Sequence, residues 1–369
     1  IMKNFLIITQ VFRPDAAAVG QYFDEAAQAI AGTGAQVTVL TANRGYDNPK
    51  EKFVAREDRN GIQIRRLSLS SFGKTSIPLR IFAQLSFLVQ CILRGLFTPN
   101  LTDLLVSTSP PMAAITAVII GLFRPKLKVH YWVMDINPDQ AITLGTFSTK
   151  HPLVQALDWL NRRILKRADS IIVLDRFMQA RLERKLKCPA EGLRAPIQVI
   201  PPWPMDDYLE TVAHSENSFR KEHGWEDKFV VMYSGNHSLV HPLDTILDAA
   251  KMLKDDPRFV FVFIGGGRGK EIVDARLREQ PSAASNIISL PYQPLDQICF
   301  SLSAADIHVV SLGHEMSGIV HPCKIYGALS IGRPVLTLGP EESYLRDITG
   351  DNEVGWSIRH GDVDSAVAA

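Results

Sequence analysis

A lysine at the start of a short predicted helix is the residue of this sequence best suited to chemistry. Residues 317–336 are Ser-Gly-Ile-Val-His-Pro-Cys-Lys-Ile-Tyr-Gly-Ala-Leu-Ser-Ile-Gly-Arg-Pro-Val-Leu, which predicts a loop, a short helix and a buried strand. Pro322 suits the first turn of that helix, and Gly332 suits its C-terminal end. A cation such as Lys324 is unfavourable beside the free N–H groups of a helix start unless an anion binds there. The segment therefore predicts a phosphate site at Lys324, and a solvated lysine on an ordinary β-α-β crossover is the alternative explanation.

Two glycine-rich turns follow predicted strands elsewhere in the second half of the chain. They are Gly235-Asn236 and Gly265-Gly266-Gly267. The second turn matches neither a dinucleotide fingerprint nor a P-loop, because Lys270 and Ile264 stand where those motifs need glycine. In a doubly wound sheet the carboxyl ends of the strands share one edge, so both turns and the Lys324 segment are expected to converge on one ligand. A tight bend without a ligand is the alternative for each turn taken alone.

The elements that would position these residues alternate along the chain as strand and helix. Buried strands are predicted at 4–9, 36–40, 104–107, 128–133, 170–174, 229–233, 259–264, 286–290, 307–311, 334–337 and 355–358. A Pro-rich run at 196–204 predicts one more strand and then a linker. This alternation predicts the α/β class, with two doubly wound domains at residues 1–200 and 201–369. Residues 362–367 look ready to start a helix, and further residues are expected beyond Ala369.

Length, composition and charge agree with two globular domains. The chain has 369 residues, 46% apolar and 21% charged, which is ordinary for such a protein. Its four scattered cysteines argue against a disulfide framework or structural zinc and favour a reducing compartment. Residues 1–200 hold 26 Lys and Arg against 15 Asp and Glu, which leaves 14 against 24 in the rest of the chain. The basic half predicts an anionic partner, a membrane surface or lipid phosphate rather than nucleic acid, with chance segregation of solvated charges as the alternative.

Two features of the basic half favour contact with a membrane. No charged residue occurs between Arg80 and Arg94, and a helix over this stretch would suit the membrane interface, although packing on the sheet is the commoner fate of an apolar stripe. Its apolar arc consists of Ile81, Phe82, Leu85, Leu88, Val89, Ile92, Leu93 and Leu96. A basic cluster follows, formed by Arg162, Arg163, Lys166, Arg167, Arg181, Arg184, Lys185 and Lys187.

Two carboxylates follow the predicted strand 128–133 of the first half. The segment is Asp135-Ile-Asn-Pro-Asp139, and Asp135 and Asp139 could orient a hydroxyl group or assist its deprotonation. Asx-turn chemistry before a proline explains the same residues equally well. His130, inside the strand, is expected to be structural.

Five motifs keep a fixed order along nearly the whole chain. They are Gln10-Val-Phe-Arg-Pro14 with Gly20, Met232-Tyr-Ser-Gly-Asn236, Phe263-Ile-Gly-Gly-Gly267, Pro322-Cys-Lys-Ile-Tyr326 and Gly332-Arg-Pro-Val335. This order resembles the family 4 retaining glycosyltransferases of the GT-B fold, in the WbuB-like branch of bacterial polysaccharide and O-antigen assembly. The resemblance implies two Rossmann-like domains that face each other across a cleft, the first for the acceptor and the second for a nucleotide-sugar. It also implies transfer with retention of anomeric configuration, without a metal ion or other cofactor.

The same resemblance implies roles for individual residues. Lys324, with backbone amides near Gly318 and Gly235, would stabilise the departing diphosphate. Asp135 and Asp139 would act on the acceptor, and Gly20 would leave room for the acceptor or a sugar phosphate. Donor binding would involve Gly235, Asn236, His241, Gly265, Gly266, Gly267, Tyr292, Ser317, Gly318, Ile319 and Val320.

The sequence departs from the family pattern at two places. The E-x7-E carboxylate pair of the family falls on Ile319 and Gly327, and its frequent Arg/Lys pair falls on Asn236 and His241. Glu315 could replace the first carboxylate after a shift in register, with an exposed loop acid as the alternative. These departures keep two other hypotheses open: a nucleotide-sugar epimerase or phosphorylase of the same fold, and a non-catalytic binding protein.

The resemblance thus predicts a hexosyl- or N-acetylhexosaminyltransferase that uses a nucleotide-sugar, with a UDP-sugar favoured. Its acceptor would be a polyprenyl-diphosphate-linked sugar or a glycan of the bacterial cell surface. The protein is expected in the cytoplasm, peripherally bound to the inner face of the cell membrane.

Overall fold

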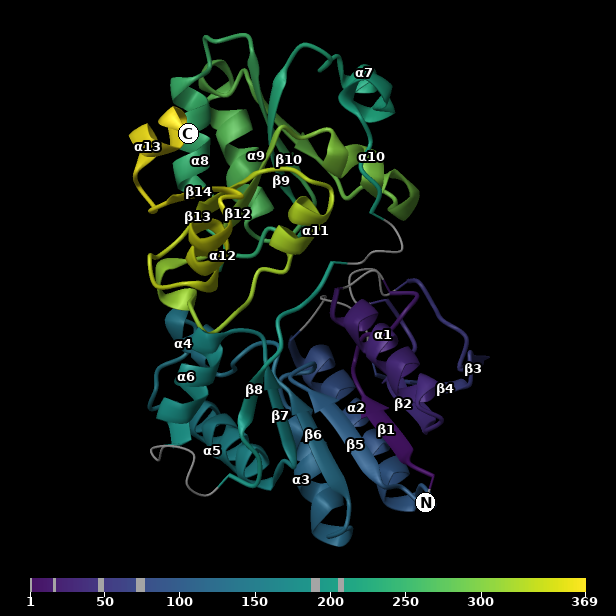
Figure 1. The fold of residues 1–369 in the computed structure, drawn as a ribbon. Helices are drawn as coiled ribbons and strands as arrows, with labels where there is room; N and C mark the ends of the chain where they lie inside the picture. Colours follow the sequence, from purple (N-terminus) through teal and green to yellow (C-terminus); the bar gives the residue numbers. More distant parts are fainter. Residues whose placement is uncertain (1, 16–17, 46–49, 71–76, 187–192, 205–208) are drawn as a thin grey trace. The chain divides into compact units, whose positions relative to one another are not determined.

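A computed structural model describes residues 2–15, 18–45, 50–70, 77–186, 193–204 and 209–369 (Figure 1). The chain divides into two compact units, residues 1–201 and 202–369. The boundary between them falls within the Pro-rich run.

Unit 1 is built on an eight-stranded sheet with the order β3-β4-β2-β1-β5-β6-β7-β8. Its strands are β1 (Asn4–Ile8), β2 (Gln36–Ala42), β3 (Arg56–Arg59), β4 (Ile62–Leu67), β5 (Asp103–Ser107), β6 (Lys128–Trp132), β7 (Ser170–Val173) and β8 (Ile197–Val199). All neighbouring strands are parallel except β3 and β4. In the centre of the sheet, Ile7 of β1 is in register with Val39 of β2 and Leu105 of β5.

The helices of unit 1 are α1 (Ala18–Gly32), α2 (Ile77–Phe97), α3 (Ala114–Phe123), α4 (Asp139–Thr143), α5 (Pro152–Arg167) and α6 (Arg176–Leu186). Small residues let three of them approach closely. A Cβ at Gly95 of α2 would lie 2.4 Å from Cδ1 of Ile120 in α3, and a Cβ at Gly121 of α3 would lie 3.0 Å from Nε of Arg167 in α5. Helices α2, α3 and α5 therefore pack side by side.

Unit 2 has a six-stranded parallel sheet with the order β11-β10-β9-β12-β13-β14. Its strands are β9 (Phe229–Ser234), β10 (Phe259–Ile264), β11 (Ile287–Leu290), β12 (Ile307–Ser311), β13 (Val335–Leu338) and β14 (Gly355–Ile358). Its helices are α7 (Ser218–His223), α8 (Asp244–Met252), α9 (Lys270–Glu279), α10 (Ile298–Ser303), α11 (Lys324–Ser330), α12 (Tyr344–Asn352) and α13 (Val363–Ala368). The last helix begins as predicted, because the Asp362 side chain accepts a hydrogen bond from the Ser365 amide at 3.1 Å.

The central strands of unit 2 are buried on both faces. Alternate residues of β9, such as Val231 and Tyr233, belong to one hydrophobic cluster, and the residues between them, such as Val230 and Met232, belong to another. Strands covered by helices on both sides need apolar residues at every position, which explains their continuous hydrophobic sequences. The predicted α/β class with two doubly wound units is confirmed.

Unit 1 contains a β-hairpin that was not predicted from the sequence. Strands β3 and β4 pair antiparallel across Asn60-Gly61, where φ is +53° and +78°. Positive φ at both central residues is typical of a type I′ turn, and Asn-Gly is its favoured sequence. The signal was therefore present, but charged β3 does not resemble a buried strand.

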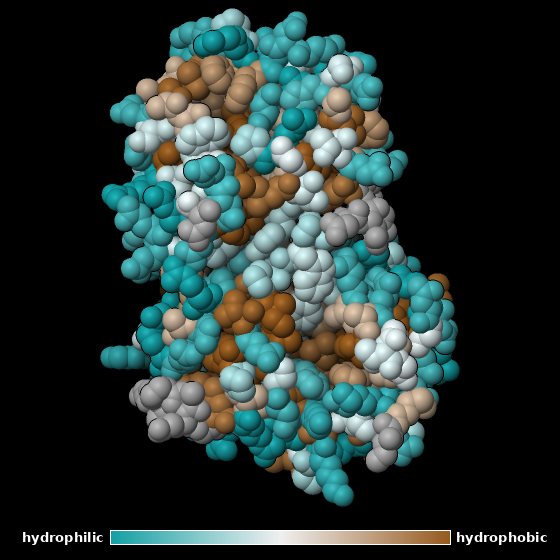
Figure 2. Space-filling model, in the orientation of Figure 1, coloured by the Kyte–Doolittle hydropathy of each residue, from teal (hydrophilic) through white to brown (hydrophobic). Residues whose placement is uncertain are grey.

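The predicted apolar arc of α2 has two different environments. Leu88 is buried, together with Ala83, Phe87 and Cys91. By contrast Ile81, Phe82, Leu85, Val89 and Leu93 are all at least half exposed. On the face drawn in Figure 2, hydrophobic residues likewise gather in patches among hydrophilic ones. Among the described helices, none combines the length and apolar character needed to cross a membrane.

Much of the predicted basic cluster of unit 1 is paired internally. Arg162 lies 2.6 Å from Asp158, and Arg167 lies 3.0 Å from Asp169. Arg181 and Lys185 both contact Asp139. Arg163, Lys166 and Arg184 are exposed, and Lys187 lies outside the described residues, so contact of this cluster with an anionic surface stays a prediction.

Candidate functional site

Lys324 is the first residue of α11, the short helix predicted from the sequence. The helix ends at Ser330, and Gly332 follows it with φ of +68°. The Gly332 amide donates to Leu329 O at 2.9 Å, and the Arg333 amide donates to Ala328 O at 3.1 Å. These two bonds form a Schellman motif, which needs glycine at this position. The predicted glycine at the C-terminal end is confirmed, whereas Pro322 lies before the helix and not in its first turn, because the helix begins at Lys324 after Cys323.

The ammonium group of Lys324 contacts the end of a different strand. Its Nζ donates to Tyr233 Oη at 2.5 Å and to Asn236 O at 3.1 Å, and it lies 4.0 Å from the centroid of the Tyr233 ring. Tyr233 Oη also donates to Asn236 O at 3.0 Å. Burial lowers the pKa of Lys324 to about 7, because charge is disfavoured where water is excluded. The contacts to Tyr233 and Asn236 bring α11 and the first glycine turn together, as predicted.

The second glycine turn interlocks with the first. At Gly265 φ is +131°, and a Cβ there would lie 2.0 Å from Gly235 O; at Gly267 φ is +115°, and a Cβ would lie 2.4 Å from Asn236 Oδ1. The Gly235 amide donates to Ile264 O at 2.9 Å, and the His237 amide donates to Gly266 O at 2.7 Å. Only glycine fits such contacts with positive φ. The three predicted turns therefore meet around the Lys324 side chain.

An aromatic side chain borders this group. Tyr292 follows β11 and is half exposed. Its Cε2 would lie 3.1 Å from a Cβ at Gly266, so its ring lies directly against the glycine turn. A half-exposed aromatic ring offers an apolar face on which a planar group can stack.

Two histidines lie behind the glycine turns. His237 is fully buried, and its Nδ1 lies 3.0 Å from Gly235 O. Burial, with the charges of Lys270 and Lys324, lowers the pKa of His237 to about 3. Burial, with the charge of Lys324, also lowers the pKa of His241 well below its usual range. His241 is therefore neutral at pH 7 and does not supply the cation that the family's Arg/Lys pair provides.

Several groups of the loop before α11 are hydrogen-bonded within unit 2. The amides of Ile319 and Val320 both donate to Met316 O, at 3.0 and 3.3 Å, and both side chains are buried. These two amides, like that of Gly235, donate to main-chain carbonyls, and their predicted contact with a diphosphate stays a prediction. Ser317 Oγ donates to Glu342 O at 2.7 Å, and Gly318 has φ of +69°.

The two positions of the missing carboxylate pair have different surroundings. Ile319 is completely buried, where an ionised carboxylate would be costly. A Cβ at Gly327 would lie no closer than 4.0 Å to the side chains of Leu209 and Leu302. Glu315 is exposed in the 3₁₀ turn His314–Met316, which matches the alternative of a loop acid.

A stack of aromatic rings, missed in the sequence, supports the same loop. The His321 ring lies 3.7 Å from that of Tyr344, and His321 Nε2 lies 2.8 Å from Tyr326 Oη. Tyr344 Oη donates to Pro322 O at 2.9 Å. These contacts join α12 to the residues just before Lys324, and they link positions too far apart in sequence for spacing to indicate them.

Lys270, which interrupts the glycine motif, has a structural role. Its Nζ donates to Phe263 O at 2.5 Å and Leu290 O at 2.7 Å. Burial lowers its pKa to about 8. The ammonium thus ties β10 to β11 and is not directed to a ligand as a P-loop lysine would be.

In unit 1, Asp135 and Asp139 have different surroundings. The Asp135 amide donates to Thr108 Oγ1 at 3.1 Å, and burial raises the pKa of the Asp135 carboxyl to about 6. Asp139 begins α4, with its carboxylate 2.9 Å from Arg181 Nε and 2.5 Å from Lys185 Nζ. Asp139 is therefore held in an ion-pair network, and only Asp135 has the elevated pKa that suits a general base.

Gly20 and His130 are the other two residues of unit 1 with a predicted role. A Cβ at Gly20 would lie 3.0 Å from the Phe12 amide nitrogen and 3.1 Å from Phe12 Cα. A side chain at Gly20 would therefore crowd the Phe12 backbone, and the expectation that Gly20 leaves room for a ligand stays a prediction. His130 pairs with Asp103 at 2.9 Å, as expected of a structural histidine.

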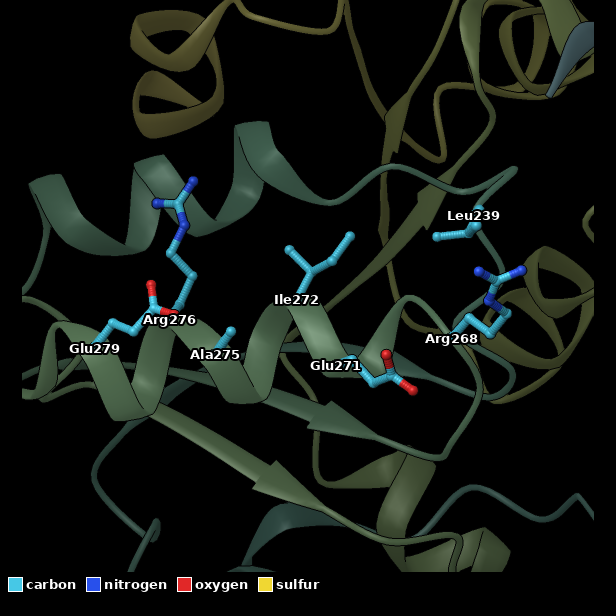
Figure 3. Close-up of a pocket in the computed structure, with 7 residues that line it drawn as sticks. All are labelled: Leu239, Arg268, Glu271, Ile272, Ala275, Arg276 and Glu279. Atoms are coloured by element: carbon cyan, nitrogen blue, oxygen red, sulfur yellow. The ribbon is translucent and has the colours of Figure 1, made fainter. Parts of the chain in front are cut away.

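A separate hollow of about 420 Å³ lies along α9 (Figure 3). It is lined by Leu239 and Ile272 together with charged side chains such as Arg268 and Glu271. None of the predicted donor residues lines it. Within the described parts of the chain, no three His, Cys, Asp or Glu side chains form a group that could hold a metal ion.

Known proteins match the chain in sequence and in fold. The family model described as a glycosyl transferase 4-like domain matches residues 17–203, and the one described as glycosyl transferases group 1 matches residues 215–369. The chain is 24% identical over 285 residues to the probable glycosyltransferase WbjE of Pseudomonas aeruginosa, covering 74% of this chain and 68% of WbjE. It is 23% identical over 341 residues to the putative colanic acid biosynthesis glycosyl transferase WcaI of Escherichia coli K12, covering 87% of this chain and 79% of WcaI.

A solved structure supports the same assignment at the level of the fold. HepE of Anabaena, in complex with UDP and glucose, superposes with a TM-score of 0.71 at 14% identity, covering 99% of this chain and 88% of HepE. This likeness confirms the predicted GT-B fold. The first family model alone matches half of the chain. This protein therefore belongs to the glycosyltransferases, as an enzyme with a glycosyl transferase 4-like domain followed by a group 1 domain.

Proposed function

We propose that the enzyme transfers a sugar from a nucleoside-diphosphate sugar to a hydroxyl group of a lipid-linked or glycan acceptor. The observation that carries this proposal is the Lys324 ammonium, held against Tyr233 and Asn236 O where three turns of unit 2 meet. A partly buried cation among backbone turns suits a diphosphate. A UDP-sugar is favoured because HepE, of the same fold, binds UDP and glucose.

In the proposed reaction, the bond between the anomeric carbon and the diphosphate oxygen breaks. The acceptor hydroxyl oxygen forms the new glycosidic bond to that carbon, the hydroxyl proton is lost, and a nucleoside diphosphate departs. Lys324 stabilises the charge that develops on the diphosphate, an effect that is usually the largest in catalysis. The new bond keeps the anomeric configuration of the donor.

On the acceptor side, we assign the proton to Asp135. Its pKa of about 6 leaves the carboxylate ionised at neutral pH and basic enough to accept a proton. The acceptor belongs to cell-surface polysaccharide assembly in this proposal, because WcaI is described as a colanic acid biosynthesis enzyme.

Calorimetric titration with UDP, GDP and ADP tests the donor site. The wild-type protein is expected to bind one of them, and Lys324→Met is expected to weaken that binding at least tenfold because a charge-assisted contact is lost. Lys251→Met, which removes an exposed lysine of α8, is the matched control and should leave affinity unchanged.

Absence of binding to all three nucleotides, or equal affinity in the Lys324→Met variant, would contradict the proposed donor site. Incubation with UDP-sugars then separates the reactions. A transferase needs an acceptor for turnover, whereas an epimerase releases an altered free sugar from donor alone.

A further inference from the structure

One side of α2 carries a continuous row of exposed apolar residues, which we call the α2 apolar row. Its members are Ile81, Leu85, Val89, Leu93 and Phe97, which are 52%, 50%, 53%, 50% and 79% exposed. Residues four apart lie on the same side of a helix, and the row extends about 24 Å at 1.5 Å per residue.

The other side of α2 is fixed to the body of unit 1. Ala83, Phe87 and Cys91 are buried, and Gly95 permits close contact with Ile120 of α3. The orientation of the helix is therefore set by packing, and the α2 apolar row faces outward as a consequence. An exposed apolar strip of this length on a globular protein marks an interaction site.

The C-terminal end of α3 extends the row. Leu122 and Phe123 are 74% and 72% exposed. The neighbouring Arg124 donates through Nη2 to Leu96 O at 2.8 Å and to Thr98 O at 2.5 Å. Arg124 thus ties the ends of α2 and α3 together and places Leu122 and Phe123 near Phe97.

The Lys, Arg, Asp and Glu residues of α2 and of the segment from α3 to β6 are all cations. Between Asp58 and Asp135 the sequence contains nine Lys and Arg and a single acid, Asp103. Asp103 is only 2% exposed and pairs with His130. Arg94, Lys126 and Lys128 are exposed.

We propose that the α2 apolar row and the end of α3 dock into the surface of an anionic phospholipid bilayer. An amphipathic helix with an apolar side and flanking cations lies in the interface plane, where apolar burial and attraction to anionic lipid act together. Anionic lipid headgroups complement this surface electrostatically, because its cations are exposed and its single acid, Asp103, is buried. Four cations of the basic cluster on α5 and α6, predicted for this role, are ion-paired. Its exposed members Arg163, Lys166 and Arg184 could add to the attraction, but the apolar contact lies on α2 and α3.

Docking of this kind does not depend on the proposed sugar transfer, because it needs neither donor nor acceptor. A membrane surface would, however, concentrate a lipid-linked acceptor beside unit 1.

Vesicle flotation tests the proposal with the whole chain. The wild-type protein is expected to float with phosphatidylcholine vesicles that contain about one third phosphatidylglycerol, more strongly than with pure phosphatidylcholine, and less at high salt. The double variant Leu85→Gln/Val89→Gln should bind the anionic vesicles at least about tenfold more weakly. Both residues are half exposed, so the fold is expected to be retained.

The matched control changes two exposed apolar residues of unit 2. Ile272→Gln/Met252→Gln, at positions 43% and 56% exposed, should leave vesicle binding unchanged. Arg94→Gln/Lys126→Gln should reduce binding to anionic vesicles with little effect on pure phosphatidylcholine. UDP affinity should be the same in all three variants, which separates a failure of docking from a failure of the donor site.

Equal flotation of the wild type and the Leu85→Gln/Val89→Gln variant, or no flotation at all, would overturn the proposal. So would a wild-type dimer in light scattering that this variant converts to a monomer, because the row would then bind a second copy of the chain.

Discussion

The surroundings of the Lys324 ammonium group favour the binding of an anion. Two oxygen atoms and an aromatic ring surround its ammonium, yet among the described residues no carboxylate is paired with it. The loss of hydration on burial therefore has a larger effect than the contacts with these neutral partners, and it lowers the pKa of Lys324 to about 7. An incoming diphosphate would supply the missing negative charge and favour the protonated form.

Binding of a nucleoside diphosphate should consequently depend on pH. In the free protein Lys324 is protonated below pH 7 and loses its proton above it, whereas the bound anion raises its pKa. Affinity for UDP should thus be constant just below pH 7 and fall by up to about tenfold per pH unit above it. Calorimetry between pH 6.5 and 9 measures this slope, and the Lys324→Met variant should lack it. A flat profile for the wild type would exclude proton uptake at this lysine.

The two aspartates of unit 1 should respond differently to loss of charge. Asp135→Asn should leave stability nearly unchanged, because burial already favours the neutral carboxyl, and should slow transfer by about 10²–10⁴-fold. Asp139→Asn should instead destabilise unit 1 by about 1–3 kcal/mol, because Arg181 and Lys185 lose their shared partner. Melting temperature and the rate of UDP release in the presence of acceptor lipid measure the two effects. A stable but inactive Asp139→Asn variant would reverse this assignment.

At the scale of elements, strand ends and turns determine the site of unit 2. Strands β9, β10 and β12 are neighbours and parallel, so their carboxyl ends lie at one edge of the sheet. The turns after β9 and β10 then touch directly, with Gly265 against Gly235 O. Backbone contacts of this kind leave no volume for a side chain.

Substitution of Gly265 tests this contact. Gly265→Ala should destabilise unit 2 by about 2–4 kcal/mol, because its Cβ would meet Gly235 O at 2.0 Å and φ is +131°. Gly332→Ala is the matched control: φ is also positive there, at +68°, but nothing lies within 4 Å of a Cβ. Its cost should be about 1 kcal/mol. Thermal unfolding compares the two variants, and equal losses would mean that backbone strain alone decides the effect.

At the scale of the whole molecule, charge and ligand chemistry are divided between the two units. The basic half of the sequence forms unit 1, which exposes the apolar side of α2, whereas the acidic half forms unit 2, which contains Lys324 and the glycine turns. Unit 2 has an excess of acidic residues, so it offers little long-range electrostatic attraction to a negatively charged diphosphate. Specific contacts at Lys324 must therefore provide its affinity.

Hydrogen exchange with and without UDP measures this division of roles. UDP should slow exchange in segments 234–241, 264–270 and 317–326 of unit 2, because ligand binding stabilises the state that holds it. Segment 135–139 of unit 1 should exchange at an unchanged rate. If UDP slowed exchange only in unit 1, the nucleotide would bind to unit 1 and the proposed donor site in unit 2 would be wrong.

The class of fold, and the convergence of the glycine turns with Lys324, could be predicted from the sequence. Continuous apolar strands, separated by helices with one apolar side, are compatible with few arrangements other than covered parallel sheets. The Gly235, Gly265 and Lys324 segments were predictable because parallel strands bring their carboxyl ends to one edge. The Asn60-Gly61 hairpin was also encoded locally, although the charged strand beside it concealed the signal.

Which polar groups already have partners could not be predicted without the folded structure. Spacing along the chain does not reveal that Arg181 and Lys185 pair with Asp139, or that Tyr344 Oη donates to Pro322 O. It likewise does not divide the apolar arc of α2 into a packed side and an exposed side. These properties arise from contacts between residues distant in sequence, and their energies depend on burial that exists only once the chain has folded.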